Sequence, residues 1–446
     1  MGRASHARAL GLWSNGVRVG TWRIPARGDM ELHYEPAWRT SAVGRPLSLS
    51  LPFDLHDRVI KGPAVGHYFE NLLPDSAEIR RRLAQRYARG SMEPFDLLTA
   101  IGRDCVGAVQ LLPEDQAPEG FDRIEGTPMS EEAIARHLHT TVTAPARGLE
   151  REEDDFRISL AGAQEKTAFL KHEGRWMRPH GATPTTHIFK LPMGLVGHRQ
   201  ADFTTSVQNE WLTMEIMRAY GLDVARCEIL QFAGQPVLCV ERFDRQLHPS
   251  GQWWMRLPQE DFCQATGRGP DAKYQAEGGP GALDIARLLQ GSENAHGDIE
   301  TLLACQVLFW LLAATAGHAK NFSIRLLAGG RFRLTPLYDV MSIWPIVGDG
   351  PNQVPWYSAK LAMAVMARSP LYRLRDIERR HFNAMAARSG YGKDAEPILR
   401  KILDATPRVI AQVRGRVPRG FPERVASRIF EGLQGAANHL AALPAR

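Results

Sequence analysis

The chain has 446 residues, of which 44% are hydrophobic and 23% charged, with a formal net charge of +6. This length and composition are typical of a globular protein with two or three domains and a large buried core. The longest apolar run, residues 302–314, is about a dozen residues long, which is too short to span a bilayer. The first residues carry no apolar segment of a secretory signal. Composition therefore argues against a membrane or secreted protein and predicts a cytoplasmic one.

Charge and cysteine content limit which partners, compartment and metal sites are expected. A net charge of +6 is mild for this length. A solvated basic surface is the simpler interpretation, and weak contact with nucleic acid, direct or through a partner, stays open. The five cysteines are scattered, without a Cys-x-x-Cys pair. This fits a reducing compartment and argues against a structural zinc site.

The first expected element is a β-hairpin over residues 8–24. Asn15-Gly16 supplies the tight turn between two alternating apolar runs. Further expected elements are helices over 76–90 and 92–101 and a strand around 106–112. One boundary is expected near residue 115, and a second at the acidic stretch 150–155, interpreted as a solvated linker. We assign residues 1–150 to a β-rich N-terminal subdomain.

After this linker the pattern changes from strands to helices. Strands are expected at 157–160, 166–171, 186–191, 226–232 and 236–242. A helix over 205–220 interrupts them, with Val207, Trp211 and Met214 at helical spacing and Gly221 at its end. Later helices are expected at 281–290, 297–315, 374–388, 395–415 and 421–443, with one strand at 331–340. The fold class is α+β: a bilobal protein-kinase-like fold, with a strand-rich lobe (151–250) and a helical C-terminal lobe (251–446) behind the N-terminal subdomain.

Phosphoryl transfer needs a loop over the phosphates, a lysine on their oxygens, metal ligands and an acid that orients or deprotonates the nucleophile. Lys190 ends the apolar strand THIFKLP, where an inward-pointing ammonium is costly unless it is paired. We interpret it as the phosphate-binding lysine; an edge lysine pointing into water is the alternative. Glu210, on the following helix, could be its ionic partner, but a surface or capping glutamate is the expected interpretation.

The stretch SLAGAQEKTAFL, residues 159–170, predicts a small-residue turn between strands. Gly162 would let backbone N–H groups approach phosphate oxygens. Lys166 adds positive charge nearby. One glycine is a weak signal, and a plain β-hairpin is the alternative interpretation.

The stretch VLCVERFDR, residues 237–245, is an apolar strand that ends in polar residues at the predicted lobe boundary. A kinase hinge would pass the adenine at this place. Glu241 and Phe243 could then offer backbone hydrogen bonds and an apolar face. A strand end followed by an ordinary loop is an equal alternative without the other parts.

The stretch LLAATAGHAKNFSIRL, residues 311–326, resembles a catalytic loop after an apolar helix. In such loops the base Asp stands five residues before a metal-binding Asn. Five residues before Asn321, this chain has Ala316. His318 lies between them, an acid-x-His order closer to lipid-kinase loops than to the His-Arg-Asp order of common protein kinases. Asp339, at the end of LTPLYDV, stands where a second metal ligand belongs.

Longer stretches point to one family. They are HYFENLLPDS (67–76), IGRDCVGAVQL (101–111), RISLAGAQEKTAF (157–169), TPTTHIFKLP (183–192), NEWL (209–212), VERFDR (240–245), RLPQEDFCQATG (256–267), KYQAEGGPG (273–281), GHAKNFSI (317–324) and LTPLYDV (334–340). Over nearly its whole length the chain resembles HipA-family toxins, the kinase half of a bacterial toxin–antitoxin module.

This resemblance implies a serine/threonine-protein kinase that uses ATP and Mg²⁺. Position by position it implies ATP contacts from Ser159, Ala161, Gly162, Ala163, Lys190, Glu241 and Phe243, Mg²⁺ ligands at Asn321 and Asp339, and catalytic-loop roles for His318 and Lys320. Ser159 resembles the serine that the family phosphorylates on itself. A phosphate there would add about −2 charge beside the turn, and repulsion could expel the turn and silence the kinase.

The resemblance also implies partners. A small HipB-like helix-turn-helix antitoxin would bind the chain and hold it on operator DNA. The substrate would be a protein of the tRNA-charging machinery, an aminoacyl-tRNA synthetase such as glutamyl-tRNA synthetase, and its phosphorylation would stop growth and produce persistence. The substrate itself, the oligomeric state, the antitoxin-docking face and the role of residues 1–115 do not follow from the sequence.

Ala316 is the departure from the family pattern, which has Asp at this position. Natural decay into a pseudokinase should cost several parts of the site, whereas here only the base is missing. We therefore favour a deliberate Asp-to-Ala change that disarms a growth-arresting enzyme. Two other functions stay open: a non-catalytic nucleotide-binding scaffold for antitoxin and DNA, and a small-molecule or lipid kinase.

Overall fold

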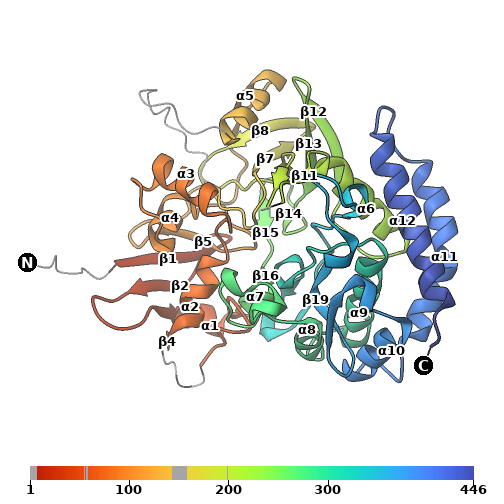
Figure 1. The fold of residues 1–446 in the computed structure, drawn as a ribbon. Coiled ribbons are helices and arrows are strands. Elements are labelled where there is room, and N and C mark those ends of the chain that lie inside the picture. The colour runs from red at the N-terminus through yellow and green to blue at the C-terminus, as the bar shows by residue number, and fades with distance from the viewer. Residues whose placement is uncertain (1–7, 55, 57–58, 143–157, 198, 446) are drawn as a thin grey trace, which may run out of the picture.

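The structure is a computed structural model that describes residues 8–54, 56, 59–142, 158–197 and 199–445. Figure 1 shows strands of the N-terminal part on one side, a second sheet at the top and helices on the other side. The first described strand, at residues 8–14, and the last helix, at residues 423–442, lie on opposite sides of the molecule. This arrangement confirms the predicted α+β order, in which a strand-rich part precedes a helical one.

The N-terminal subdomain contains an antiparallel sheet, with strand order β4-β3-β2-β1-β5, and, among its described residues, four helices. Its elements are β1 (Arg8–Ser14), β2 (Val17–Ile24), β3 (Glu31–Tyr34), α1 (Pro36–Thr40), β4 (Ile60–Lys61), α2 (Pro63–Glu70), α3 (Ala77–Tyr87), α4 (Pro94–Ile101) and β5 (Gln110–Pro113). The predicted hairpin is confirmed, because Asn15 and Gly16 both have positive φ, as a two-residue hairpin turn requires. Trp22 of β2 stacks on Phe69 of α2 in the subdomain core.

A second antiparallel sheet forms the upper lobe of the kinase-like part, in the order β12-β13-β9-β7-β8-β6. Its strands are β6 (Gly126–Pro128), β7 (Lys166–His172), β8 (Arg175–Pro179), β9 (His187–Lys190), β12 (Cys227–Phe232) and β13 (Gln235–Glu241). Helix α5 (Glu131–Val142) covers one face and α6 (Ser206–Ala219) the other, because Val237 and Cys239 pack with α5 whereas Leu238 packs with α6.

The position of β6 and α5 differs from the predicted subdomain 1–150. Both elements belong to the second sheet and its core, so the compact N-terminal unit ends at β5, close to the expected boundary near 115. The acidic stretch 150–155 lies outside the described residues. The strand expected at 157–160 is reduced to a single bridge between Ile158 and Asp104.

The C-terminal lobe is built around α9 (Ala295–Leu311), whose residues from Leu302 onward are all buried. The other helices are α7 (Phe262–Ala265), α8 (Ala282–Leu289), α10 (Arg379–Arg388), α11 (Glu396–Arg414) and α12 (Glu423–Ala442). Smaller sheets in the two kinase-like lobes contain β10 (Gly194–Val196) with β11 (Ala201–Phe203), β14 (Arg245–Leu247) with β15 (Trp254–Arg256), β16 (Gln259–Asp261) with β17 (Ser323–Leu326) and β18 (Phe332–Leu334), and β19 (Lys360–Met366) with β20 (Pro370–Arg373). The strand predicted over 331–340 is therefore shorter, and β19 was not predicted.

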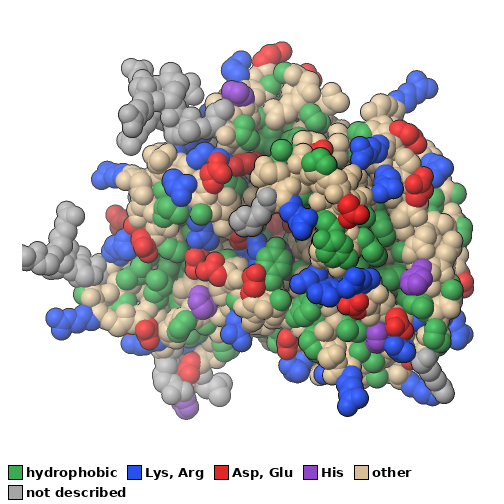
Figure 2. Space-filling view, viewed as in Figure 1, with side chains coloured by type: hydrophobic (Ala, Val, Ile, Leu, Met, Phe, Trp, Pro, Cys, Tyr) green, Lys and Arg blue, Asp and Glu red, His purple; other side chains and the backbone are tan. Residues whose placement is uncertain are grey.

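On the face in Figure 2, basic and acidic side chains are interspersed over most of the surface. Within the described part of the chain, no helix is both long and apolar enough to cross a membrane. All five cysteines are free thiols.

Candidate active site

Strand pleating decides where Lys190 points. In β9, Lys190 lies directly opposite Leu238 of β13 and Lys166 of β7, so the three side chains share the face of the sheet that α6 covers. Its neighbour Phe189 faces the other way and packs on Phe169. The alternation of the strand therefore sends Lys190 into the space between the two kinase-like lobes.

Lys190 has two carboxylate partners there. Its Nζ donates to Glu210 Oε1 at 2.6 Å and to Asp339 Oδ1 at 2.6 Å. Burial opposes its charge, but the two carboxylates outweigh burial and raise the pKa of Lys190 above its usual value. Glu210 is buried on α6, so the expectation of a surface or capping glutamate is wrong and the ionic partner is the observed role.

Asp339 and Asn321 come together at the same point. Asn321 Nδ2 donates to Asp339 Oδ2 at 2.8 Å. Asp339 has a left-handed backbone (φ 62°), and its side chain is 32% exposed. Burial favours the neutral acid, but the ammonium of Lys190 outweighs it and holds the pKa of Asp339 below its usual range.

These groups fit a magnesium ion that is shared with phosphates. Mg²⁺ prefers oxygen ligands and usually takes one or two carboxylates, substrate phosphates and waters instead of an all-protein cage. Asp339 supplies a carboxylate of that kind, and Asn321 lies beside it with its amide nitrogen toward Asp339 and its amide oxygen on His318 N. In the described ranges there is no group of three or more His, Cys, Asp or Glu that could hold a metal alone.

The loop after α9 is fixed by close packing. A Cβ at Gly317 would lie 2.2 Å from the ring of Phe309, so only glycine fits. Asn321 Oδ1 accepts from His318 N at 3.0 Å and closes a 3₁₀ turn, Ala319–Asn321. Ala316 is partly exposed just before this turn. The packing of Gly317 and the 3₁₀ turn therefore fix the conformation of this loop. At the position where a kinase base is expected, the side chain is a methyl group.

His318 is a neutral imidazole in this loop. Burial, with a smaller effect of Lys273, lowers the pKa of His318 to about 4. Its ring packs edge-on against the ring of Tyr274, with the two ring centroids 5.1 Å apart. Among the described residues, Nδ1 of His318 is buried without a hydrogen-bond partner. The predicted catalytic-loop position is therefore occupied by an uncharged ring.

The small-residue turn lies beside Lys190. Gly162 has φ 106°, and Lys166 Nζ donates to the carbonyl of Ala161 at 2.7 Å. Burial, together with the nearby Lys190 ammonium, lowers the pKa of Lys166 to about 8. Ala161 and Gly162 are partly exposed and Ala163 is exposed. An anion would relieve the repulsion between two lysines placed opposite each other.

Ser159 lies behind this turn and is fully buried. Its Oγ donates to Leu72 O at 2.8 Å, and its backbone N donates to Asp104 O at 3.1 Å. Both acceptors belong to the N-terminal subdomain. In this conformation the serine hydroxyl is closed off from the cleft.

The predicted hinge follows β13. The backbone N of Glu241 donates to Arg226 O, and its side chain is exposed. Phe243 packs on Tyr338 with ring centroids 5.7 Å apart, and its carbonyl accepts from Arg325 at 2.7 Å. The hinge is thus next to the residue that precedes Asp339, so an apolar wall borders the Lys190–Asp339 cluster.

Lys320 does not join the Lys190–Asp339 cluster. Its Nζ donates to Asp75 Oδ1 at 2.9 Å and approaches Asn71 O at 3.3 Å, both in the N-terminal subdomain. Sequence reasoning gave no role to Asp75, although it lies in the stretch HYFENLLPDS that contributed to the resemblance. The contact joins residues 245 positions apart, which local patterns do not reveal.

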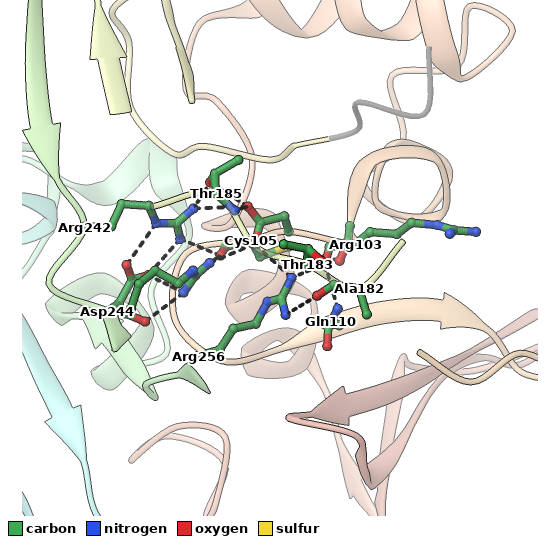
Figure 3. Close-up of polar contacts among 12 residues, drawn as sticks. Arg103, Cys105, Gln110, Ala182, Thr183, Thr185, Arg242, Asp244 and Arg256 are labelled. Atoms are coloured by element: carbon green, nitrogen blue, oxygen red, sulfur yellow. Dashed lines mark hydrogen bonds and ion pairs between the residues drawn. The ribbon is translucent and has the colours of Figure 1, made fainter. Parts of the chain in front are cut away.

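A buried ion network behind the hinge was also missed. Asp104 accepts from Arg245 at 2.9 Å and from Arg256 at 3.2 Å, and Arg242 lies 3.4 Å away. Arg242 and Arg245 also contact Asp244. Figure 3 shows the guanidinium groups of Arg242 and Arg256 converging on the loop that carries Cys105. The network ties the N-terminal subdomain to the residues on either side of Phe243.

Comparisons with known families give the same assignment over most of the chain. The model of the HipA-like C-terminal domain matches residues 158–410. The model of the HipA N-terminal domain matches residues 10–112. The second match ends just before the end of β5, where the structure closes the N-terminal subdomain.

Individual relatives are kinases by name. A putative kinase of Sinorhizobium fredii, Y4mE, is 33% identical over 91% of this chain and 92% of its own length. The serine/threonine-protein kinase toxin HipA of Shewanella oneidensis is 28% identical over 73% of each chain. A solved structure from that organism, the toxin–antitoxin system HipA, HipB and its operator DNA complex, has the same fold, with a TM-score of 0.77, 22% identity and 97% of each chain covered. This chain belongs to the HipA family of kinases.

Proposed function

We propose that this chain is the toxin kinase of a toxin–antitoxin pair, built to transfer the γ-phosphate of ATP to a serine or threonine of a protein, and that it is inactive as written because position 316 lacks a carboxylate. The connected groups Lys190, Asp339 and Asn321 carry this proposal. They supply the phosphate lysine and the oxygen ligands that phosphoryl transfer requires.

ATP would lie between the two kinase-like lobes. Its adenine would contact Glu241 and Phe243 at the hinge, and its phosphates would contact Lys190, Lys166 and the turn of Ala161–Ala163. Asn321 and Asp339 would hold Mg²⁺, which neutralises phosphate charge. The protein's own part is to position these groups and to exclude water, since phosphoryl transfer depends mainly on positioning and electrostatics.

The partners proposed for the chain are those its relatives suggest. The solved Shewanella complex is named for HipA, HipB and operator DNA. A HipB-like helix-turn-helix antitoxin would neutralise this chain in the cytoplasm and link it to operator DNA. The protein substrate would be an aminoacyl-tRNA synthetase, such as glutamyl-tRNA synthetase, and its modification would cause growth arrest and persistence.

Ala316 supports a second candidate function. Without a base, the chain could act as a nucleotide-binding pseudokinase that serves as a scaffold for antitoxin and DNA. The two candidates separate in cells: growth arrest by an Ala316→Asp chain, but not by the chain as written, supports the toxin kinase. Antitoxin-dependent DNA binding without arrest by either chain supports the scaffold.

The chain as written should bind Mg-ATP, because removal of the base leaves Lys190, Asn321 and Asp339 in place. Asp339→Asn should weaken Mg-ATP binding by at least about tenfold, since it removes the carboxylate from the metal site and from Lys190. Isothermal titration calorimetry with and without Mg²⁺ measures this. Asp376→Asn, a matched loss of one exposed carboxylate, should change nothing. Equal affinities for the chain and its Asp339→Asn variant would remove the metal role of Asp339.

Ser159→Asp should expel the turn from the site. Ser159 is fully buried and its hydroxyl donates to a carbonyl oxygen, so a carboxylate there would be unpaired and would face another acceptor. We expect ATP affinity to fall at least about tenfold in the active Ala316→Asp background. Ser159→Ala, which loses one hydrogen bond worth about 1 kcal/mol, should keep most of the affinity. Unchanged ATP affinity in Ser159→Asp would refute regulation through this serine.

A further inference from the structure

Asp75 lies where the N-terminal subdomain touches both halves of the candidate active site. It follows α2 by a short loop and directly precedes Ser76, the N-cap of α3. Its backbone N donates to Gly162 O at 3.0 Å, and Pro74 forms a bridge with Gly162. The backbone of Asp75 therefore holds the turn that would receive the phosphates.

The side chain of Asp75 contacts the catalytic-loop side of the candidate active site. Oδ1 accepts from Lys320 at 2.9 Å and Oδ2 accepts from Lys273 at 2.8 Å. The side chains are well shielded, with exposures of 9% for Asp75 and 4% for Lys320. Burial opposes ionisation, but the two ammonium groups outweigh it and lower the pKa of Asp75 to about 2. The carboxylate is therefore charged throughout the physiological pH range.

Lys320 connects Asp75 to Asn321, the proposed metal ligand that follows it in the chain. It precedes Asn321 in the 3₁₀ turn that follows His318, and its carbonyl accepts from Tyr338 at 2.9 Å. Asn321 in turn contacts Asp339. Both ammonium contacts of Lys320, Asn71 and Asp75, come from the N-terminal subdomain. The position of this turn thus depends on a residue outside the two kinase-like lobes.

We propose that Asp75 is a positioning residue for phosphoryl transfer: its backbone and its carboxylate set the phosphate-binding turn against the catalytic loop. This inference rests on the proposed kinase function. It gives the N-terminal subdomain a role in catalysis, because the subdomain supplies the clamp that joins Gly162 to Lys320.

The charges around Asp75 predict different effects of Asp75→Asn on kcat and on KM for ATP. One carboxylate serves two lysines, so the cluster Asp75–Lys273–Lys320 is net positive, and Asp75→Asn makes it more positive. Attraction for the phosphates of ATP should therefore persist or grow. The placement of the turn and the loop should become looser, and a misplacement of about 1 Å can cost about 10²-fold in rate. A fall in kcat without a rise in KM for ATP is the signature of positioning.

The test compares Asp75→Asn with its parent in the Ala316→Asp background. We expect kcat to fall at least about tenfold while KM for ATP does not rise. Asp75→Glu, which keeps the charge, should recover part of kcat. Glu78→Gln removes a carboxylate three residues away whose side chain is 77% exposed, and it should leave both constants unchanged. An unchanged kcat, or a rise in KM together with a lower melting temperature, would overturn the inference.

A second measurement separates failure of this inference from failure of the proposed function. Amide hydrogen exchange is measured on the chain as written, with no need for activity. Asp75→Asn should speed exchange both in the turn around Gly162 and in Ala319–Asn321, whereas Glu78→Gln should speed neither. If the Ala316→Asp parent is inactive, the kinase proposal fails, but faster exchange in both segments still supports the clamp. Exchange that stays unchanged in either segment contradicts the clamp.

Discussion

Ala316→Asp is expected to raise the rate of phosphoryl transfer by about 10²–10⁴-fold, the usual contribution of a positioned acid–base group. The surrounding site is already in place. Lys190 contacts Asp339, and Asp339 contacts Asn321. The backbone carbonyl of Ala316 accepts from His318 N at 2.8 Å, which does not involve the side chain. The substitution should therefore add a carboxylate without changing the loop.

Single-turnover transfer from γ-labelled ATP, to the chain itself or to a purified protein, measures this gain. Ala316→Asn is the matched control, because it has the shape of aspartate without the charge, and it should stay near the activity of the chain as written. Robust activity of the chain as written, or equal rates for the Asp and Asn variants, would remove the role given to position 316. Transfer to lipid instead of protein would support the lipid-kinase alternative.

Asp104→Ala should destabilise the protein by about 3–5 kcal/mol, the usual cost of breaking a buried ion pair. Arg242, Arg245 and Arg256 all approach this carboxylate, and their side chains are at most 2% exposed. Without Asp104, Arg242 and Arg245 would keep Asp244 as a carboxylate partner, whereas Arg256 would lose the carboxylate that it contacts (Figure 3). Uncompensated buried charge is the reason for the large expected loss.

Urea unfolding, followed by the midpoint and the slope, measures this loss of stability. Glu114→Ala, which removes a surface carboxylate about 4.0 Å from its arginine partners, should change the free energy of unfolding by less than about 1 kcal/mol. Burial favours the neutral form of Asp104, but the arginines outweigh it and depress its pKa. Its stabilisation is thus present at neutral pH and is lost as pH falls below the range of an ordinary carboxyl group. A loss under 1 kcal/mol in Asp104→Ala would contradict this account of the network.

The sequence predicted most of the α-helices and the strands β1, β2, β5, β7, β9, β12 and β13 because their periodicity is local, whereas most of the shorter strands were not predicted. The hairpin at Asn15-Gly16 follows from turn chemistry. Helix α3, predicted over 76–90, follows from the local sequence pattern. The β6 strand was missed because its pairing with β8 joins residues some 50 positions apart. Likewise, β19 has the apolar run of a strand or a buried helix, and its pairing with β20 decides between them.

The candidate site was predicted in part. The order of Lys190, Asn321 and Asp339 indicated the phosphate lysine and metal ligands, and the structure brings them together. Glu210 was misjudged because α6 is buried between the second sheet and the helical lobe, so polar residues on it are also enclosed. Amphipathic spacing predicts one exposed face, and a helix covered on both sides has none.

The contacts of the N-terminal subdomain could not be predicted from local patterns. Asp75 and Asp104 look like solvated surface charges until the fold places lysines and arginines around them. The origin of Ala316, an engineered change or natural decay, stays a prediction. The intact cluster of Lys190, Asp339 and Asn321 is what a single substitution would leave.

The most direct test of the proposal that this kinase site lacks only its base is a phosphoproteome comparison in cells. Three chains are expressed: the chain as written, Ala316→Asp, and Ala316→Asp combined with Asp339→Asn. We expect new phosphoserine or phosphothreonine sites on protein targets with Ala316→Asp only, accompanied by growth arrest. The same sites with all three chains, or no new site with Ala316→Asp, would contradict the account.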